Sequence, residues 1–115
     1  MKLKLLALAA LVGCASVPAG NLPAASVVVT NDHWLDQVVY ANCGTTIRVG
    51  VARGLGETTL RLPVACVDRS VSFTVDPIGS NSRSVSDAIT AVAYDRLALT
   101  IPSYDNGYLF ISRVR

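Results

Sequence analysis

The chain has 115 residues, of which 51% are hydrophobic and 16% are charged, a balance that suits one small packed domain and excludes a disordered chain. Its formal charge of +2 depends on Lys2 and Lys4, because the eight arginines are balanced by eight acidic residues. No basic segment follows the first residues, so the sequence predicts no nucleic-acid partner.

Residues 1–13 are predicted to be a lipoprotein signal peptide. Two lysines precede an apolar run over residues 5–12, which is the pattern of an export signal and is much shorter than the roughly 20 residues of a transmembrane helix. Leu11-Val12-Gly13-Cys14 resembles a bacterial lipobox. This implies that Cys14 carries palmitate or similar acyl chains, which together give a stable membrane anchor.

The cellular location is predicted from the same motif. Ala15, rather than an aspartate, follows Cys14, and by resemblance to the sorting rules of Gram-negative bacteria this favours the outer membrane of the cell envelope. The alternative is ordinary cleavage after Ala19, which would release a secreted or periplasmic protein. Residues 14–25 are rich in proline, glycine and small side chains and are expected to be a flexible tether.

From residue 26 onward, hydrophobic and polar residues alternate, which indicates β-strands. Seven or eight short strands are typical of an antiparallel β-sandwich, Ig-like or similar, so residues 26–115 are predicted to be one all-β domain. The segment 85–93 fits a strand better than a short helix, although Ser86-Asp87-Ala88 would also cap a helix. The predicted strands cover residues 26–30, 37–41, 46–52, 58–62, 70–75, 85–93, 97–101 and 108–114.

Two glycine-containing segments are predicted to be hairpin turns. Gly54-Leu55-Gly56 separates two alternating runs, and Asn106-Gly107 fits a two-residue type I′ turn because both residues tolerate a positive φ. Pro102 cannot donate a hydrogen bond within a sheet, so its strand is expected at an edge or at a bulge. An edge strand and a terminal hairpin would also suit a subunit that exchanges a strand within a larger assembly.

The three cysteines predict one disulfide. If Cys14 carries the lipid, or leaves with a longer leader, Cys43 and Cys66 remain as a pair, and an exported location favours their oxidation. A redox pair would need a C-x-x-C motif, and a metal site would need more ligands than the single histidine, His33, supplies. A meander of the second, third and fourth predicted strands would bring both cysteines to one rim. We expect no metal and no cofactor.

The segment 31–36 gathers His33 and Trp34, each the single residue of its type, with Asp32 and Asp36. A small hydrolase or metal-dependent enzyme could use His33 as a base or ligand with one of these carboxylates. The same residues suit a turn, because Asn and Asp hydrogen-bond to nearby backbone, and Trp34 suits a contact surface. Motifs such as G-x-S-x-G and H-E-x-x-H do not occur, so no catalytic residue is assigned.

Aromatic residues also gather near the last predicted turn. Tyr104 and Tyr108 lie on either side of it, and with His33 and Trp34 they are candidates for a contact surface; packing within the sheet is the alternative. The sequence therefore favours a binding or structural module of the cell envelope over an enzyme. The expected partners are the membrane, through the N-terminal lipid, and another envelope protein.

Four segments carry a resemblance to a known group: V-x-V-x-N from Val27, L-D-x-x-V-Y from Leu35, R-V-G from Arg48 and D-P-I-G-S from Asp76. In these segments the chain resembles a group of small uncharacterised bacterial lipoproteins, over most of residues 27–102. The resemblance implies a lipid anchor and a β-sandwich. It implies no site residue, because the group has no assigned activity.

Overall fold

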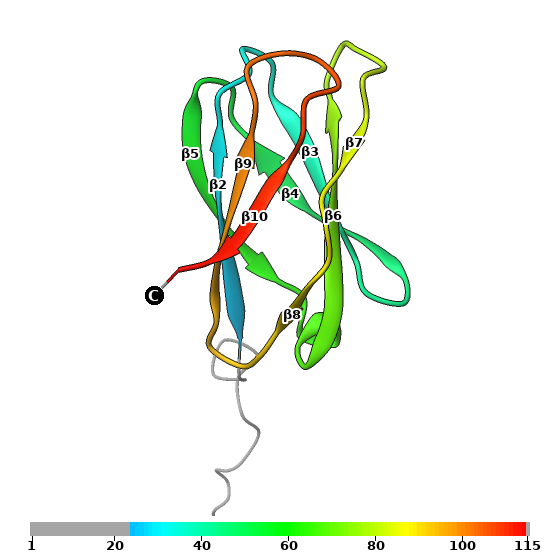
Figure 1. The fold of residues 1–115 in the computed structure, drawn as a ribbon, viewed down its shortest axis with the longest axis vertical. Helices are drawn as coiled ribbons and strands as arrows, with labels where there is room; N and C mark the ends of the chain where they lie inside the picture. Colours follow the sequence, from blue (N-terminus) through cyan, green and yellow to red (C-terminus); the bar gives the residue numbers. More distant parts are fainter. Residues whose placement is uncertain (1–23, 115) are drawn as a thin grey trace, which may run out of the picture.

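The computed structural model describes residues 24–114, which form two β-sheets packed face to face (Figure 1). The predicted all-β sandwich is therefore confirmed. The signal peptide, Cys14 and most of the predicted tether lie outside the described residues. No helix within residues 24–114 has the length and hydropathy of a transmembrane segment. The elements are β2 (Ala25–Asn31), β3 (Gln37–Asn42), β4 (Thr46–Ala52), β5 (Gly56–Leu62), the 3-10 turn η3 (Val64–Cys66), β6 (Arg69–Pro77), β7 (Ser84–Val85), β8 (Ile89–Ala91), β9 (Arg96–Ile101) and β10 (Phe110–Arg113).

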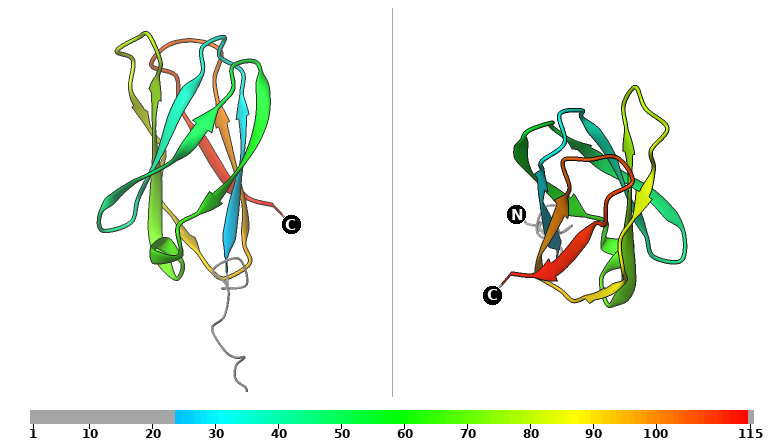
Figure 2. Two further views of the ribbon diagram at one scale, coloured as in Figure 1. Left: turned by 180° about the vertical axis from the view of Figure 1, so that it is seen from behind. Right: turned by 45° about the horizontal axis from the view of Figure 1, so that its top comes forward.

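The strands divide between two sheets, which Figure 2 shows from behind and from the upper end. One sheet has the order β10-β9-β2-β5, and the other has the order β4-β3-β6-β7, with β8 also paired to β6. Neighbouring strands are antiparallel except β2 and β9, which pair in parallel from Ser26 opposite Arg96 to Asn31 opposite Ile101. The prediction of a wholly antiparallel sandwich is wrong at this pair.

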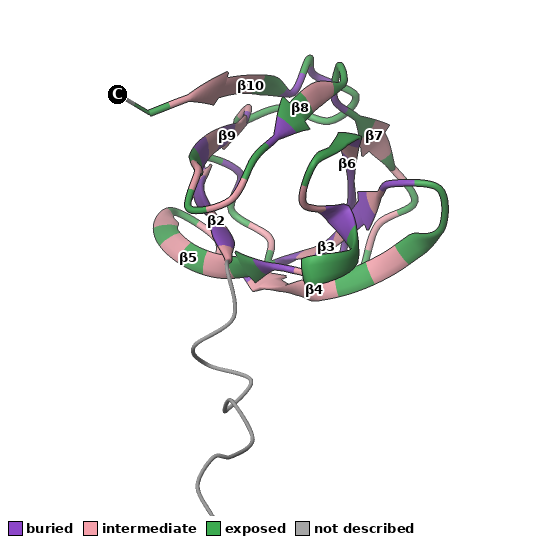
Figure 3. Ribbon diagram, turned by 90° about the horizontal axis from the view of Figure 1, so that it is seen from below, coloured by how far each residue is buried: buried purple, intermediate pink, exposed green. Residues whose placement is uncertain are grey.

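The core lies between the sheets and consists of alternate residues of the longer strands. On β6 the predicted inward residues Val71, Phe73 and Val75 are buried, and alternate residues of β9 are buried likewise. On the outer strand β5, exposed and half-buried residues alternate until the buried Leu62 (Figure 3). Removing apolar surface from water, at roughly 25 cal/mol per Å², is what holds the two sheets together.

The segment 53–55 turns the chain as predicted, but it joins the two sheets instead of forming a hairpin. β4 is the outer strand of one sheet, and β5 pairs with β2 in the other. The predicted meander is therefore wrong at its third strand. Alternation could not reveal this, because the apolar residues of β5 face the same core from either sheet. Gly54 lies so close to the Trp34 carbonyl that an added Cβ would be 2.3 Å from its oxygen.

The connection between β9 and β10 is the loop 102–109 and not the predicted two-residue turn. Asn106 has a positive φ of 58°, but Gly107 is needed for space, because an added Cβ would lie 2.3 Å from Cγ of Pro102. The prediction that the strand at Pro102 lies at a sheet edge or carries a bulge is also wrong, because β9 lies between β10 and β2 and pairs regularly with both. Pro102 follows the last residue of the strand, where the sheet needs no N–H donor.

The segment 85–93 begins with the last residue of the short strand β7, includes the short strand β8 and contains no helix. Both strands pair with β6, and the buried Ser86 lies between them. Oγ of Ser86 accepts a hydrogen bond from the N–H of Phe73 (2.9 Å), and the N–H of Ser86 donates to the Phe73 carbonyl (2.8 Å). Ser86 thereby satisfies the backbone of β6 where the ladder is interrupted, which explains why the predicted strand is split.

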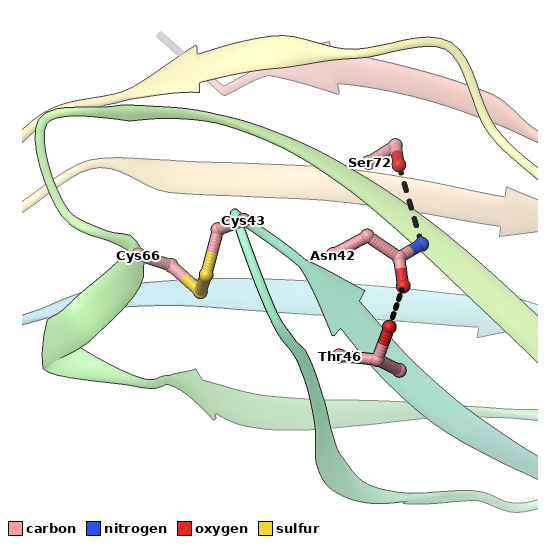
Figure 4. The surroundings of a disulfide bond; sticks show 5 residues. All are labelled: Asn42, Cys43, Thr46, Cys66 and Ser72. Carbon is pink, nitrogen blue, oxygen red and sulfur yellow. Dashed lines mark hydrogen bonds between the residues drawn. A yellow bond between two sulfur atoms is a disulfide. The ribbon is translucent and has the colours of Figure 1, made fainter.

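Cys43 and Cys66 form the predicted disulfide, with 5.3 Å between their Cα atoms (Figure 4). Cys43 follows β3, and Cys66 ends η3 shortly before β6. Because β3 pairs with β6, both cysteines lie at the lower end of the sandwich. Their approach therefore does not need the predicted meander. Beside them Asn42 donates to the Ser72 hydroxyl (3.2 Å) and accepts from the Thr46 hydroxyl (3.0 Å). These bonds join β3 to both of its neighbours.

Candidate functional site

The loop between β2 and β3 is held by Asn31, the last residue of β2. Its side chain is almost fully buried; Oδ1 accepts the His33 N–H (3.0 Å), and Nδ2 donates to the carbonyls of Leu35 (2.9 Å) and Ala52 (3.2 Å). An Asn that bonds to backbone two residues onward favours a turn, and the bond to Ala52 ties this turn to the end of β4. The backbone that carries His33 and Trp34 is therefore fixed.

His33 points into the protein and connects two loops. Its side chain is 5% exposed. Nδ1 accepts the Leu35 N–H (3.0 Å), and Nε2 lies 2.7 Å from Oδ1 of Asp105. A nitrogen that accepts an N–H carries no hydrogen of its own, so Nε2 is the nitrogen that donates to the carboxylate. The imidazole thereby fastens the β9–β10 loop to the β2–β3 loop.

The β2–β3, β4–β5 and β9–β10 loops lie at the upper end of the sandwich (Figure 1), and each carries a large exposed side chain. Trp34, Leu55 and Tyr104 are 71%, 74% and 65% exposed, and they lie in the β2–β3, β4–β5 and β9–β10 loops respectively. We call these three residues the upper rim. Exposed apolar groups gathered in one region are typical of a surface that contacts another molecule.

The three loops of the upper rim are bonded to one another. The His33 carbonyl accepts the Leu55 N–H (2.9 Å), and Oδ1 of Asp36 accepts the Gly54 N–H (2.8 Å). The bond from His33 to Asp105 adds the third loop (2.7 Å). The upper rim therefore projects from a backbone that is held in place, which limits the ordering cost of binding.

Tyr108 is separate from the upper rim. It is exposed, and its hydroxyl donates a hydrogen bond to the carboxylate of Asp87, between β7 and β8. That hydrogen bond is the largest reason why the pKa of Tyr108 is raised above the ordinary 10.0, followed by desolvation and by the negative charge of Asp87. The predicted group of four thus divides: His33 bonds to the loop that carries Tyr104 through Asp105, whereas Tyr108 is bonded to Asp87 between β7 and β8.

The carboxylate that meets His33 is Asp105, 72 residues away, in place of Asp32 or Asp36. Asp36 caps the N–H of Gly54, and the side chain of Asp32 is exposed. Within residues 24–114, no group of three or more His, Cys, Asp or Glu side chains could hold a metal ion. In the described structure His33 makes a hydrogen bond between two loops.

Sequence reasoning missed Asp105 and Leu55 as parts of this region. Nothing local marks Asp105 as a partner of His33, because the two meet only through the pairing of β2 with β9. The prediction of a turn at 54–56 gives Leu55 no role of its own. An apolar residue at the tip of a turn, between two glycines, is a signal that could identify it.

Comparisons with known proteins give information about the fold of this chain only. No family model matches the chain, and no curated protein matches it. Among solved structures, an NMR structure of a protein from Eubacterium rectale is similar, with a TM-score of 0.57 and 10% sequence identity, over 87% of this chain and 98% of that chain. At such low identity the similarity shows a shared architecture, and it assigns no activity to this chain.

Proposed function

We propose that this protein is a lipid-anchored binding module of the cell envelope, held in the outer membrane through Cys14, and that its upper rim binds another envelope protein. The observation that carries the proposal is the position of the upper rim relative to the chain entry. β2 begins at Ala25 at the lower end and runs seven residues, about 23 Å at 3.3 Å per residue, to the loop that carries Trp34. An anchor before β2 would leave the upper rim facing away from the membrane.

The chemistry of the upper rim supports a protein partner with apolar and basic groups. Trp34, Leu55 and Tyr104 supply apolar and aromatic surface, and large aromatic residues are frequent in the energetically important centres of protein interfaces. The charged residues of the same three loops are Asp32, Asp36 and Asp105 against Arg53. Complementary charge on the partner would speed association and exclude acidic competitors.

Site-specific photo-cross-linking in cells tests the binding surface. The photoreactive residue p-benzoylphenylalanine is placed in the full chain at position 34, 55 or 104, with position 94 as the matched control. Tyr94 is 76% exposed and precedes β9 at the lower end. We expect one adduct of common mass from the three rim positions and none from position 94. Equal adducts from position 94, or no adduct from any rim position, would contradict the proposal.

The lipid anchor is tested separately. Mass spectrometry is expected to show that the mature chain begins at an acylated Cys14. The variant Cys14→Ser is expected to move the protein from the membrane to the soluble fraction. A mature chain that begins after Ala19, or a serine variant that stays in the membrane, would contradict anchoring at Cys14. Neither result bears on the surface that binds the partner.

We also infer that the sandwich is of the Ig-like type. Seven of its strands have four or more residues, and they form two sheets in one small domain, which agrees with the size and strand number of that class. The short β7 and β8 act as one interrupted strand along β6. An experimental structure that changed the order of strands in either sheet would contradict this inference.

A further inference from the structure

A buried polar atom of β3 has no protein partner among the described residues. Gln37, the first residue of β3, is 1% exposed, and its Oε1 accepts no hydrogen bond. Buried side-chain amides in folded proteins are nearly always hydrogen-bonded. Rotating the amide by half a turn would place Nε2 at the same position. The position therefore requires a partner, whichever atom occupies it.

Gln37 lines a cavity of about 10 Å³ beneath the β9–β10 loop. This is about the volume that one water molecule needs, and larger ligands do not fit. The wall also carries polar groups from two other segments, Ser82 and Ser84 on one side and Asp105 and Asn106 on the other. Small cavities with several polar groups hold water, whereas cavities that stay empty are apolar.

Another polar residue of the wall, His33, cannot supply the missing bond. His33 lines the same cavity, but Nδ1 already accepts the Leu35 N–H and Nε2 already faces Asp105. Both ring nitrogens are therefore engaged. None of the other described residues donates a hydrogen bond to Oε1 of Gln37, so the structure leaves this acceptor open to a small donor.

We propose that this cavity is a binding site for one internal water molecule, which donates a hydrogen bond to Oε1 of Gln37 and bonds to the polar wall of the β9–β10 loop. The water is a third attachment of this loop, besides the bond between His33 and Asp105 and the burial of Leu109, which is 1% exposed. The site is independent of the proposed function, because Gln37 is not part of the upper rim.

A crystal structure at about 1.5 Å resolution tests the site directly. We expect one density peak in the cavity, at a hydrogen-bond distance of about 2.7–3.2 Å from the side-chain oxygen of Gln37. In Gln37→Leu the peak is expected to disappear, because no acceptor remains there. In Gln37→Glu, a matched variant that keeps the acceptor, the peak is expected to persist. An empty cavity in the wild type, or a Gln37 amide bonded directly to a protein group, would overturn the proposal.

A measurement in solution does not depend on whether the variants fold. In the wild-type protein, rotating-frame NMR is expected to show cross-peaks between water and the side-chain amide protons of Gln37. Their sign is expected to be that of dipolar transfer from a bound water molecule, which is opposite to the sign of chemical exchange. No transfer to these protons, under conditions where exposed amides show exchange, would overturn the proposal. A peak that survives unchanged in Gln37→Leu would likewise show that Gln37 does not hold the water.

Discussion

Breaking the disulfide between Cys43 and Cys66 is expected to cost about 3 kcal/mol of unfolding free energy. The bond spans 23 residues, and in the chain-entropy model a loop of that size reduces the entropy of the unfolded chain by an amount equivalent to about 3 kcal/mol at 25 °C. For a domain of this size, that loss corresponds to a decrease in Tm of roughly 12–24 °C. Both sulfur atoms are buried in the lower end of the core, so reduction adds no new contact in exchange.

The assay is urea unfolding followed by circular dichroism, on the full chain carrying Cys14→Ser so that Cys43 and Cys66 are its only cysteines. Comparing oxidised and reduced protein keeps both sulfur atoms in place. With the urea dependence typical of small domains, about 1–3 kcal/mol per molar, the midpoint is expected to fall by about 1–3 M on reduction. Free thiols before reduction would refute the pairing. If the bond is present before reduction, an unfolding midpoint that stays the same after reduction would refute the entropic reasoning.

Three further substitutions test other parts of the structure. Asn31→Ala removes three hydrogen bonds, two of them buried and one part-buried, and is expected to lower the unfolding free energy by about 3 kcal/mol, measured by urea titration. Gly107→Ala places a Cβ 2.3 Å from Pro102 and is expected to displace the β9–β10 loop and cost about 1–3 kcal/mol, measured by the chemical shifts of that loop and by Tm. Asp87→Asn is expected to lower the pKa of Tyr108 toward 10.0, measured by NMR titration. Because this pKa is raised in the folded protein, the hydrogen bond stabilises the fold below pH 10.0 and its contribution is lost as the pH rises through the pKa of Tyr108.

Matched controls separate these effects from general damage. Asn81→Ala changes an exposed asparagine and is expected to leave stability nearly unchanged, so an equal loss from both alanine variants would refute the role of Asn31. Gly56→Ala meets its nearest atoms at 3.8 Å and should perturb the protein less than the change at Gly107. For the titration, Tyr108→Phe identifies the resonance. A pKa of Tyr108 that does not respond to Asp87→Asn would show that Asp87 is not its cause.

The strands could be predicted from sequence because their information is local. Alternation over 46–52 gave both ends of β4 correctly, and alternation over 70–75 identified the buried face of β6. Pairing was less predictable. Both sheets bury their apolar residues in one core, so the sequence of β5 is equally compatible with either sheet. The cysteine pair was predictable for another reason, since removing Cys14 from the count left one combination.

The candidate site was only half predictable. The clustering of His33 and Trp34 in one segment indicated the loop that the structure places at the upper end of the sandwich. The carboxylate partner of His33 could not be predicted, because Asp105 is brought to it by a parallel strand pair that alternation does not indicate. Asn106-Gly107 also gave a misleading signal: the glycine is required by the approach of Pro102 and not by a two-residue turn.

The parallel pairing of β2 with β9 has a consequence for when the domain can complete its folding. β2 gains one neighbour from β5, but its other neighbour is residues 96–101, near the end of the chain. Contacts so distant in sequence slow folding, because a long loop must close before they form. The N-terminal part of a chain is synthesised first, so β2 must wait for nearly the whole chain before this second neighbour is available. The sheet that contains β2 is therefore the last to be completed, and a chain truncated before β9 would leave β2 as an open edge.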